Sequence, residues 1–514
     1  MPETLMLDRG PITLESALNK DKNTIHEAAY FAATQELCKG LWASRRTIDA
    51  LVRHHLALGD GNSLYKCVVA PPSQWIRGSF NVCVPVEVKS RKGTQKRVVF
   101  RCAMPHKLAE ARHPGTVDEK LSCEVGMYVW MQDQCDDVRI PHLYGFGFSD
   151  HRHFTREDQM PFYVRLWRAI QRHLRPLFGY PNLSRYAPNP TSVRMTTAYM
   201  LLEHIGPETG RMLSHTWEQR RGDPVLRQRL FRGMARVIIS LARVPQPRIG
   251  SFEFRADGTV TLTNRPLSCC IPILENNCAP RTIPRSQTYT CVEPFVADML
   301  AFHDETFLAD QNAVYDASNC RGEMTARAIL RTVSHHYVTR ERRSGPFYLQ
   351  LTDFHASNIF VDDDWNLTCL IDLEWICSLP AENFAAPYWL TGRGIDELEG
   401  DDLVEFEKVH QEFLDILEKE EIAMAPERKP ALVNILRENW ESGAVWFWHC
   451  LLSINAQWSL VDEHISPKYR PLSSTVEDVL YHFWCQDAFK VVDRKVDDYE
   501  EYEKELKRVF DKEA

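Results

Sequence analysis

Three oxygen-bearing side chains, Asp353, Asn358 and Asp372, lie in one short part of the chain at intervals that suit the chemistry of phosphates. The segment reads LTDFHASNIFVDDDWNLTCLIDLEW, so that Asn358 follows Asp353 by five residues and Asp372 follows Asn358 by fourteen. Phosphoryl transfer needs one carboxylate to orient and deprotonate the attacking hydroxyl, and oxygen ligands that hold Mg²⁺ against nucleotide phosphates. An aspartate, an asparagine and a second aspartate supply these groups.

The same residue types also have purely structural uses, because aspartate and asparagine form helix caps and turns. The run 362–364 is interpreted in this way, as part of a polar turn. Asp353 and Asp372 differ in their setting. Each lies at the end of an apolar strand, a β-hairpin separates the two, and His355 and Glu374 flank them. This setting favours a functional site.

Short strands are the elements that would position these side chains. We predict strands at 348–352, 358–361 and 367–371, with a turn over 362–366. Alternating apolar patterns and helical periodicity predict further elements upstream and downstream. These are a hairpin of strands 81–88 and 97–102 around the turn 90–95, a helix at 117–132, strands at 143–148 and 199–203, a helix at 224–242, a hairpin over 252–263, and helices at 294–307, 325–340 and throughout the region after 397.

The motifs around Asp353 resemble those of the aminoglycoside phosphotransferase and choline kinase-like family. The signature of that family is His-Gly-Asp, four residues, Asn, a hairpin and then Ile-Asp. The resemblance implies that Asp353 is the catalytic base and that Asn358 and Asp372 bind Mg²⁺. It also implies supporting roles for His355 and for Glu374, an acid that would act on the metal from behind the direct ligands.

The resemblance continues upstream, in the order that a protein-kinase-like fold requires. Gly78 and Ser79 resemble a reduced loop over the nucleotide phosphates, and Arg101 stands where the family has a phosphate-contacting lysine. Glu124 resembles the helix acid that pairs with this cation. The hinge that binds a nucleobase through its backbone corresponds to Leu202, Glu203 and His204. The greatest likeness is to fungal members of the family whose substrate is uncertain, which share a Pro-Tyr-Trp-Leu run like that at 387–390.

The resemblance implies an α+β, bilobal fold with a small antiparallel-sheet N-lobe and a larger, mainly helical C-lobe. We expect a helical amino-terminal extension at 1–66, an N-lobe at 67–203 with an insertion at 150–195, and a C-lobe at 204–514 that contains the catalytic and metal-binding hairpin 347–376. The implied activity is transfer of a γ-phosphate from ATP or GTP, with Mg²⁺, to a hydroxyl of a small molecule.

Two departures from the family pattern leave a second hypothesis open. Leu351 and Thr352 replace the His-Gly before Asp353. Arg101 stands in the place of a lysine, and a guanidinium group is not equivalent to the compact ammonium of lysine. A nucleotide-binding scaffold without strong catalysis, a pseudokinase, is therefore the alternative. A protein kinase is disfavoured, because no activation segment with an Ala-Pro-Glu anchor follows Asp372, where Ile-Asp-Leu-Glu-Trp leads instead into an aromatic run.

Composition limits the partners and the location. A net charge of −9 and a pI near 6.1 give no global attraction for nucleic acid. The chain has no run of about 18 apolar residues, so we expect no membrane span. Fifteen cysteines without CxxC pairs favour reduced thiols and a cytoplasmic protein. The sequence predicts no oligomeric state.

Other clusters have a functional and a plainer interpretation. Cys269, Cys270 and Cys278 lack a fourth ligand for zinc. The histidine pairs 54–55 and 335–336 point to different sides of a helix, so they are interpreted as surface or helix-end residues. A predicted arginine face within 165–175 would either grip an anion or be solvated. A group of acids would likewise either favour a cationic acceptor or be solvated; its members are Glu397, Glu399, Asp401, Asp402 and Glu405.

Overall fold

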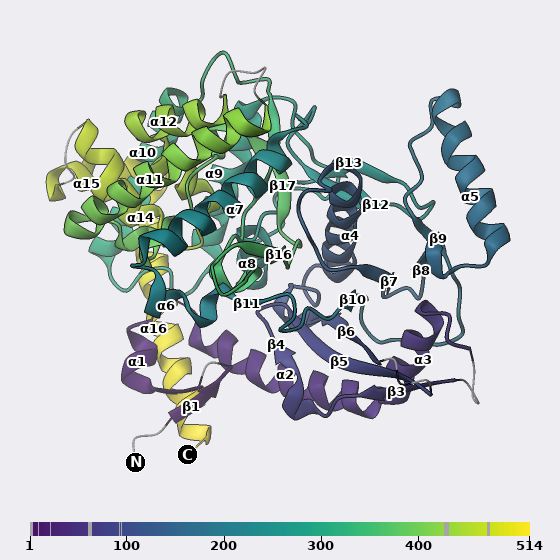
Figure 1. The fold of residues 1–514 in the computed structure, drawn as a ribbon. Coiled ribbons are helices and arrows are strands. Elements are labelled where there is room, and N and C mark those ends of the chain that lie inside the picture. The colour runs from purple at the N-terminus through teal and green to yellow at the C-terminus, as the bar shows by residue number, and fades with distance from the viewer. Residues whose placement is uncertain are drawn as a thin grey trace.

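The chain is an α+β protein in which an antiparallel sheet lies beside a mainly helical region (Figure 1). The computed structural model describes residues 4–513 except 9, 21, 60–63, 92, 94, 426–430 and 470–472. The expected α+β class is confirmed at this level. Within the described residues, no helix is both long enough and apolar enough to cross a membrane.

Eight of the described strands form one antiparallel sheet with the order β3-β5-β6-β10-β7-β8-β9, and β4 pairs with β5 at one side. The predicted hairpin is confirmed as β5 and β6, although Lys92 and Thr94 of its predicted turn lie outside the described residues. The strands of this sheet are β3 (Tyr65–Val69), β4 (Ile76–Arg77), β5 (Asn81–Ser90), β6 (Gln95–Ala103), β7 (Leu143–Gly147), β8 (His153–Arg156), β9 (Tyr186–Pro188) and β10 (Tyr199–Glu203).

Helix α4 (Thr116–Gln134) is buried along most of its length, between this sheet and a hairpin of β12 (Ser251–Phe254) and β13 (Val260–Asn264). Its Gly126 allows the hairpin to approach closely, because a Cβ there would lie 3.0 Å from backbone atoms of Phe252. The Ser122 hydroxyl donates to the carbonyl of Phe254 at 3.0 Å. The hairpin therefore fixes the position of α4 from the side that faces away from the sheet.

The helical region packs around one apolar core and encloses two short strand pairs and one added strand. The strands are β11 (Arg211–Met212), β14 (Phe347–Leu351), β15 (Ile359–Val361), β16 (Leu367–Leu370) and β17 (Ile376–Pro380). The helices are α6 (Trp217–Arg220), α7 (Pro224–Ala242), α8 (Cys270–Asn276), α9 (Val292–Ala309), α10 (Ala317–Tyr337), α11 (Gly400–Met424), α12 (Leu432–Ser442), α13 (Ala444–Leu452), α14 (Gln457–Leu460), α15 (Ser474–Leu480) and α16 (Ala488–Glu513).

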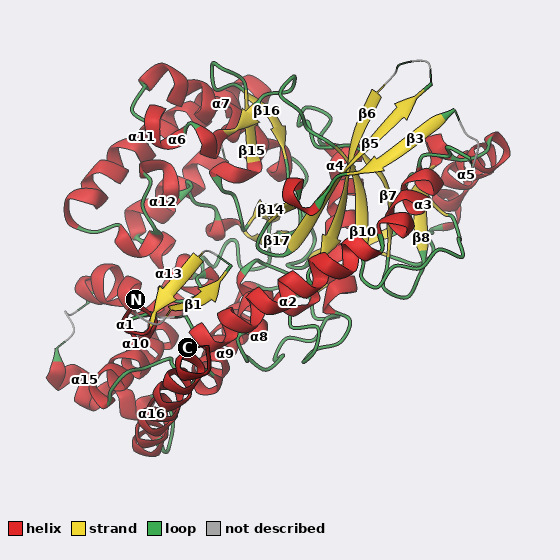
Figure 2. Cartoon of the chain, turned by 90° about the horizontal axis from the view of Figure 1, so that it is seen from below, coloured by secondary structure: helices red, strands yellow, loops and turns green. Residues whose placement is uncertain are grey.

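The amino-terminal segment is not purely helical, which corrects the prediction for 1–66. It begins with a hairpin of β1 (Thr4–Leu7) and β2 (Gly10–Thr13), and strand β3 starts at Tyr65. The helices that follow the hairpin are α1 (Leu14–Leu18), α2 (Thr24–Ala43) and α3 (Arg45–His55). Helix α2 runs from the region of β1 and α16 to the large sheet (Figure 2). The segment thus connects the helical region with the sheet.

The predicted insertion at 150–195 is also corrected, since both of its ends belong to the large sheet. Strand β8 pairs with β7, and β9 pairs with β8. The part that stands away from the sheet is α5 (Phe162–Leu174) (Figure 1). Glu157 binds Arg168 and Arg172 at the base of this helix, at 2.6 and 2.7 Å. These two arginines therefore serve the structure of the protrusion.

Candidate active site

The three predicted strands around Asp353 are confirmed, but their pairing differs from a single hairpin over 347–376. Strands β15 and β16 form the hairpin, around the turn that Asp362 closes by accepting from the N–H groups of Asp364 and Asn366, both at 2.9 Å. Strand β14 pairs instead with β17, which the sequence did not predict. The two loops that carry Asp353 and Asp372 therefore emerge next to each other.

Asn358 connects these two loops. Its side-chain amide donates to the backbone carbonyl of Asp353 at 2.9 Å, and its backbone carbonyl accepts from the N–H of Ile371 at 2.9 Å. The next residue, Asp372, has a φ of 62°, in the left-handed region that aspartate tolerates better than most residues. The side-chain oxygen of Asn358 has no hydrogen-bond partner among the described residues, so it is free to bind a ligand.

The loop before Asn358 is braced by residues that differ from the family signature. Nε2 of His355 lies 3.1 Å from Oδ1 of Asp353. Thr352, which stands where the family has glycine, donates its hydroxyl to the carbonyl of Trp375 at 2.8 Å and accepts from the N–H of Cys269 at 3.0 Å. The loop is thus fixed at both ends without the histidine that the signature places before the aspartate.

Arg101, on strand β6, contacts three carboxylates. It forms the expected ion pair with Glu124 of α4, and it also binds Asp372 and, at 2.9 Å, Glu374. The guanidinium group is thus engaged with the residues that were expected to hold Mg²⁺ and to support it. Arg101 was expected to face the nucleotide phosphates, whereas here its Nη1 and Nη2 donate to protein carboxylates.

Lys120 and Asn81 complete this cluster, and the sequence interpretation missed both. Lys120 lies one helical turn before Glu124, is almost fully buried, and forms ion pairs with Glu124 at 3.4 Å and with Glu374. Asn81 donates to Glu374 at 2.8 Å and accepts from Lys120 at 3.0 Å. The i, i+4 spacing of Lys120 and Glu124 was the signal that could have indicated the lysine.

The charges in the cluster are unequal, since three carboxylates face two cations. Burial raises the pKa of Asp372 to about 7, helped by the charges of Glu374 and Glu124 and opposed by Arg101. Burial would also raise the pKa of Glu374, but Lys120 and Arg101 outweigh it and lower that pKa below its ordinary value. Two cations balance only two of the three carboxylate charges. The raised pKa of Asp372 means that its carboxylate takes up a proton more readily than an ordinary aspartate.

The donor set fits a divalent cation that prefers oxygen ligands. Carboxylate oxygens of Glu124, Asp372 and Glu374 lie within 4.8 Å of one another. All the hydrogen bonds to Glu374 fall on Oε2, and Arg101 binds Oδ1 of Asp372. Oε1 of Glu374 and Oδ2 of Asp372 have no such partner among the described residues. Asp372 and Glu374 could thus each offer one carboxylate oxygen to a cation, and the expectation that Asp372 and Asn358 hold Mg²⁺ stays a prediction.

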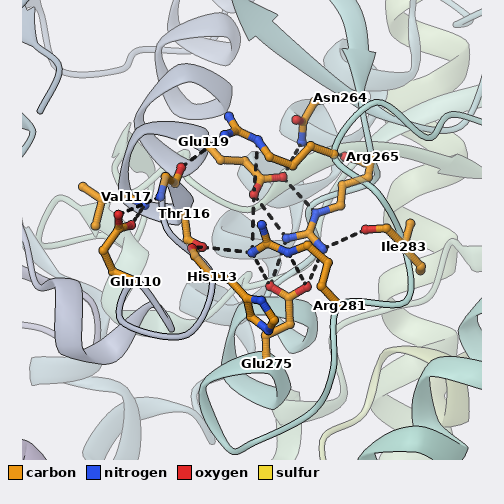
Figure 3. Close-up of polar contacts among 12 residues, drawn as sticks. Glu110, His113, Thr116, Val117, Glu119, Asn264, Arg265, Glu275, Arg281 and Ile283 are labelled. Atoms are coloured by element: carbon orange, nitrogen blue, oxygen red, sulfur yellow. Dashed lines mark hydrogen bonds and ion pairs between the residues drawn. The ribbon is translucent and has the colours of Figure 1, made fainter. Parts of the chain in front are cut away.

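An ion network with a fully buried centre anchors the start of α4 (Figure 3). Arg265 binds Glu119 and Glu275, and no part of these three side chains is exposed. Arg281 joins Glu275 at 2.7 Å, and Asn264 donates to Glu119 at 3.1 Å. Because Glu119 precedes Lys120 on the same helix, this network fixes the part of α4 that carries Lys120 and Glu124.

Gly78 and Ser79 form an exposed turn between β4 and β5, where a loop over phosphates was expected. The N–H of Gly78 donates to the carbonyl of Asn81 at 2.9 Å, and Ser79 lines the same cavity as Asp353. The turn is held down by Phe80, whose ring packs edge-on against Trp375 with centroids 5.0 Å apart. The turn therefore lies beside the loop of Asp372.

The expected hinge is at the end of the central strand β10, but its N–H groups are engaged. The N–H of Glu203 donates to the carbonyl of His142 at 2.8 Å, and that of His204 is directed at the carbonyl of Arg97 at 3.5 Å. Leu202 is buried in the sheet. The sheet therefore occupies the N–H groups of Glu203 and His204, and binding of a nucleobase through backbone groups of this segment stays a prediction.

A cavity of about 480 Å³ opens beside Asp353. Aliphatic and aromatic side chains make up most of its wall, with Phe354, Tyr388, Trp389 and Trp448 among them. His449 also lines it, and burial lowers the pKa of this histidine to about 4, so the ring is neutral at physiological pH. Of the five acids considered for a cationic acceptor, none lines the cavity, whose acidic lining residues are Asp353, Glu382 and Asp396.

Searches of protein-family models and of curated protein sequences find no match to this chain.

Proposed function

We propose that this protein is a phosphotransferase that moves the γ-phosphate of ATP or GTP to a hydroxyl of a small molecule, in a cleft between the lobes of a protein-kinase-like fold. In this proposal the large sheet and α4 form the N-lobe, and the helical region from 204 onward forms the C-lobe. The observation that carries it is the double contact of Asn358, which holds Asp353 at the cavity and the segment of Asp372 at the buried cations.

The residues divide the work of transfer between them. Asp353 orients the acceptor hydroxyl and takes its proton while the phosphoryl group passes from the nucleotide to the acceptor oxygen. When bound, Mg²⁺ neutralises phosphate charge, and Asp372 and Asn358 would hold it. Glu124 and Lys120 keep Arg101 and Glu374 in fixed positions next to Asp372.

The cavity supports an acceptor with a substantial apolar body and a hydroxyl directed at Asp353. Its volume lies within the usual range of about 300–1,000 Å³ for small-molecule sites. The five acids that were considered for a cationic acceptor are absent from its wall, so they give no reason to expect a cation. All fifteen cysteines are free thiols, which supports a reducing, cytoplasmic location.

The test is calorimetric titration of ATP with and without Mg²⁺, combined with slow hydrolysis of ATP, in which water accepts the γ-phosphoryl group and ADP and phosphate are formed, as the measure of turnover. Asp353→Asn should bind ATP with Mg²⁺ like the wild type but lose turnover by about 100-fold or more. Asp372→Asn should lose the dependence of binding on Mg²⁺. Asp363→Asn, an exposed aspartate of the same hairpin, is the matched control. Full turnover in Asp353→Asn would contradict the assignment of the base.

A nucleotide-binding scaffold is the second candidate, because Arg101 binds Asp372 and Glu374 rather than pointing its donors at a free site. The same titration separates the two functions. Binding that depends on Mg²⁺ without any turnover, in the wild type and with a panel of hydroxylated compounds, would favour the scaffold.

A further inference from the structure

Helix α5 presents its apolar face to solvent and its arginine face to the body of the protein, the reverse of an ordinary surface helix. Trp167 is 60% exposed, whereas Arg168, the next residue, is only 7% exposed. At about 3.6 residues per turn, six large apolar side chains fall on one side of α5, and all six are exposed. This apolar face consists of Phe162, Tyr163, Leu166, Trp167, Ile170 and Leu174.

Polar contacts on the opposite side of α5 fix this orientation. Nη2 of Arg168 donates to the carbonyls of Ser184 and Tyr186, both at 2.9 Å, in addition to the ion pair with Glu157. Arg175, directly after the helix, lies 3.2 Å from Asp257 in the turn between β12 and β13. The arginine face cannot turn outward without the loss of these contacts. The exposure of the apolar face is therefore built into the fold.

The apolar face continues past the end of the helix and lies on a protrusion. Leu177 and Phe178, in the short helical turn that follows α5 (Arg175–Phe178), are also exposed. Figure 1 shows α5 standing away from the body of the protein, beyond β8 and β9 at the edge of the large sheet. Soluble monomers rarely expose a contiguous apolar patch of this kind unless it binds something. A protrusion suits a broad, deformable surface as its partner.

Charge indicates which surface this is. No acidic residue occurs between Asp158 and Glu203, although six arginines do, in a protein with a net charge of −9. Glu157 and Asp257 bind three of these arginines. The other three are exposed and form no ion pair with a described residue; they are Arg165, Arg185 and Arg194. A second copy of this face would bring like charges together, whereas anionic lipid headgroups attract them.

We propose that α5 and the turn after it bind the surface of an anionic lipid bilayer. The apolar face enters the boundary between headgroups and acyl chains, where tryptophan and tyrosine are favoured, and Arg165 on its flank meets the headgroups. The helix lies along the surface, since its 13 residues are too few to cross the hydrocarbon core. The proposal is independent of the phosphotransferase assignment, because no residue of α5 lines the cavity beside Asp353.

The test is flotation of the full chain with two kinds of vesicle, pure phosphatidylcholine and phosphatidylcholine with about one third phosphatidylserine. The protein should float with the anionic vesicles and remain unbound with the neutral ones, and added salt should weaken the binding. Trp167→Gln/Phe178→Gln should lower the partition coefficient by about tenfold or more, because two large apolar side chains no longer enter the bilayer. Arg165→Gln should lower it by about fivefold, the effect of one basic residue at an anionic surface.

Phe483→Gln is the matched control, because Phe483 is a similarly exposed phenylalanine of the helical region. It should float like the wild type, and thermal unfolding verifies that each variant folds. No flotation with the anionic vesicles, or equal flotation of the wild type and the double variant, would overturn the proposal. Equal binding to neutral vesicles would overturn the role of charge. Sedimentation velocity without vesicles measures the oligomeric state, and a dimer that the double variant dissociates, without flotation, would assign the apolar face to a second copy instead.

Discussion

Arg101 contacts three carboxylates from two parts of the chain because a guanidinium group carries five N–H donors in one plane. A lysine at this position could not bind all three in the same geometry, since its ammonium is a compact group on a flexible stem. The chain supplies a lysine as well, but from α4. Arg101 and Lys120 therefore share the task of balancing Glu124 and Glu374 inside the protein.

Removal of Lys120 should be costly, because it leaves buried carboxylates with one cation. We expect Lys120→Met to lower the free energy of unfolding by about 3 kcal/mol, the size typical of a broken buried ion pair. The double variant Lys120→Met/Glu374→Gln should recover part of this loss, since it also removes a charge. Urea unfolding of the four members of the cycle gives the coupling energy.

The surface pair of Lys490 and Asp487 provides a control for the lysine substitution. Both side chains are exposed, so Lys490→Met should change stability by less than about 0.5 kcal/mol. Equal effects of Lys120→Met and Lys490→Met would show that the buried lysine stabilises the protein no more than a surface lysine does. No recovery in the double variant Lys120→Met/Glu374→Gln would show that Lys120 and Glu374 are not coupled.

The residues with local signals were predictable, and those defined by distant contacts were not. Asp353, Asn358 and Asp372 stand at the ends of short apolar strands, a pattern visible in the sequence alone. The partnership of Arg101 with Asp372 joins residues 271 positions apart, and no local pattern encodes it. Asn81 was missed for the same reason, because its carboxylate partner lies 293 positions away.

At the scale of elements, the start of α4 depends on a carboxylate from outside the helix. Gly115 occupies the N-cap position and has no side chain that could accept the first N–H groups. Glu110 caps the helix instead, since its carboxylate accepts from the N–H of Gly115 and of Val117, both at 2.7 Å (Figure 3). The carboxylate also interacts favourably with the helix dipole.

Replacement of Glu110 should therefore destabilise α4 from its first turn. Glu110→Ala should lower the free energy of unfolding by about 1–2 kcal/mol, the usual cost of a lost cap. Glu110→Gln keeps one acceptor oxygen without the charge, so it should lose less. Chemical denaturation measures both, and a larger loss in the glutamine variant would exclude capping as the reason.

Elements were predicted well where their own pattern sufficed. Strand β10 and helix α7 have the predicted limits, because alternation and helical periodicity are properties of single segments. Strands β8, β9 and β17 were not predicted. Each of them is short, and β17 pairs with a strand almost thirty residues earlier, so that tertiary pairing rather than propensity defines it.

At the scale of the whole molecule, the two ends of the chain pack together. Leu5, Leu7 and Ala17 form a small core with Tyr502 and Leu506 of α16. The N–H of Thr24, at the start of α2, donates to the hydroxyl of Tyr502 at 3.1 Å. Because α2 continues to the large sheet, α16 supports a segment that connects both regions of the protein (Figure 2).

Loss of this small core should loosen both chain ends at once. Leu506 is fully buried, and Leu506→Ala should destabilise the region by about 2–4 kcal/mol. Hydrogen exchange should then show reduced protection in α1 and the start of α2 as well as in α16, while the large sheet keeps its protection. Loss of protection in α16 alone would mean that the two ends are not coupled.

Buried histidines should make the whole molecule sensitive to mild acid. Burial lowers the pKa of His303 and of His410 to about 4, below the value of about 6.5 in an unfolded chain. Between these values the unfolded state binds more protons than the folded state, so stability falls as the pH is lowered through this window. Each histidine should remove about 1–2 kcal/mol by about pH 5.

His410 is the better residue for the test, because it stacks on Trp440 and its pKa is lowered by burial alone. His410→Phe keeps an aromatic ring but cannot take up a proton, so its unfolding free energy should fall less steeply between about pH 7 and 5. The slope is the readout, since the phenyl ring can change absolute stability through packing. His335→Gln, at an exposed position, is the control and should leave the slope unchanged. An equal slope in His410→Phe and the wild type would mean that the acid sensitivity arises elsewhere, because a histidine that binds equally many protons in the folded and unfolded states contributes nothing to the linkage.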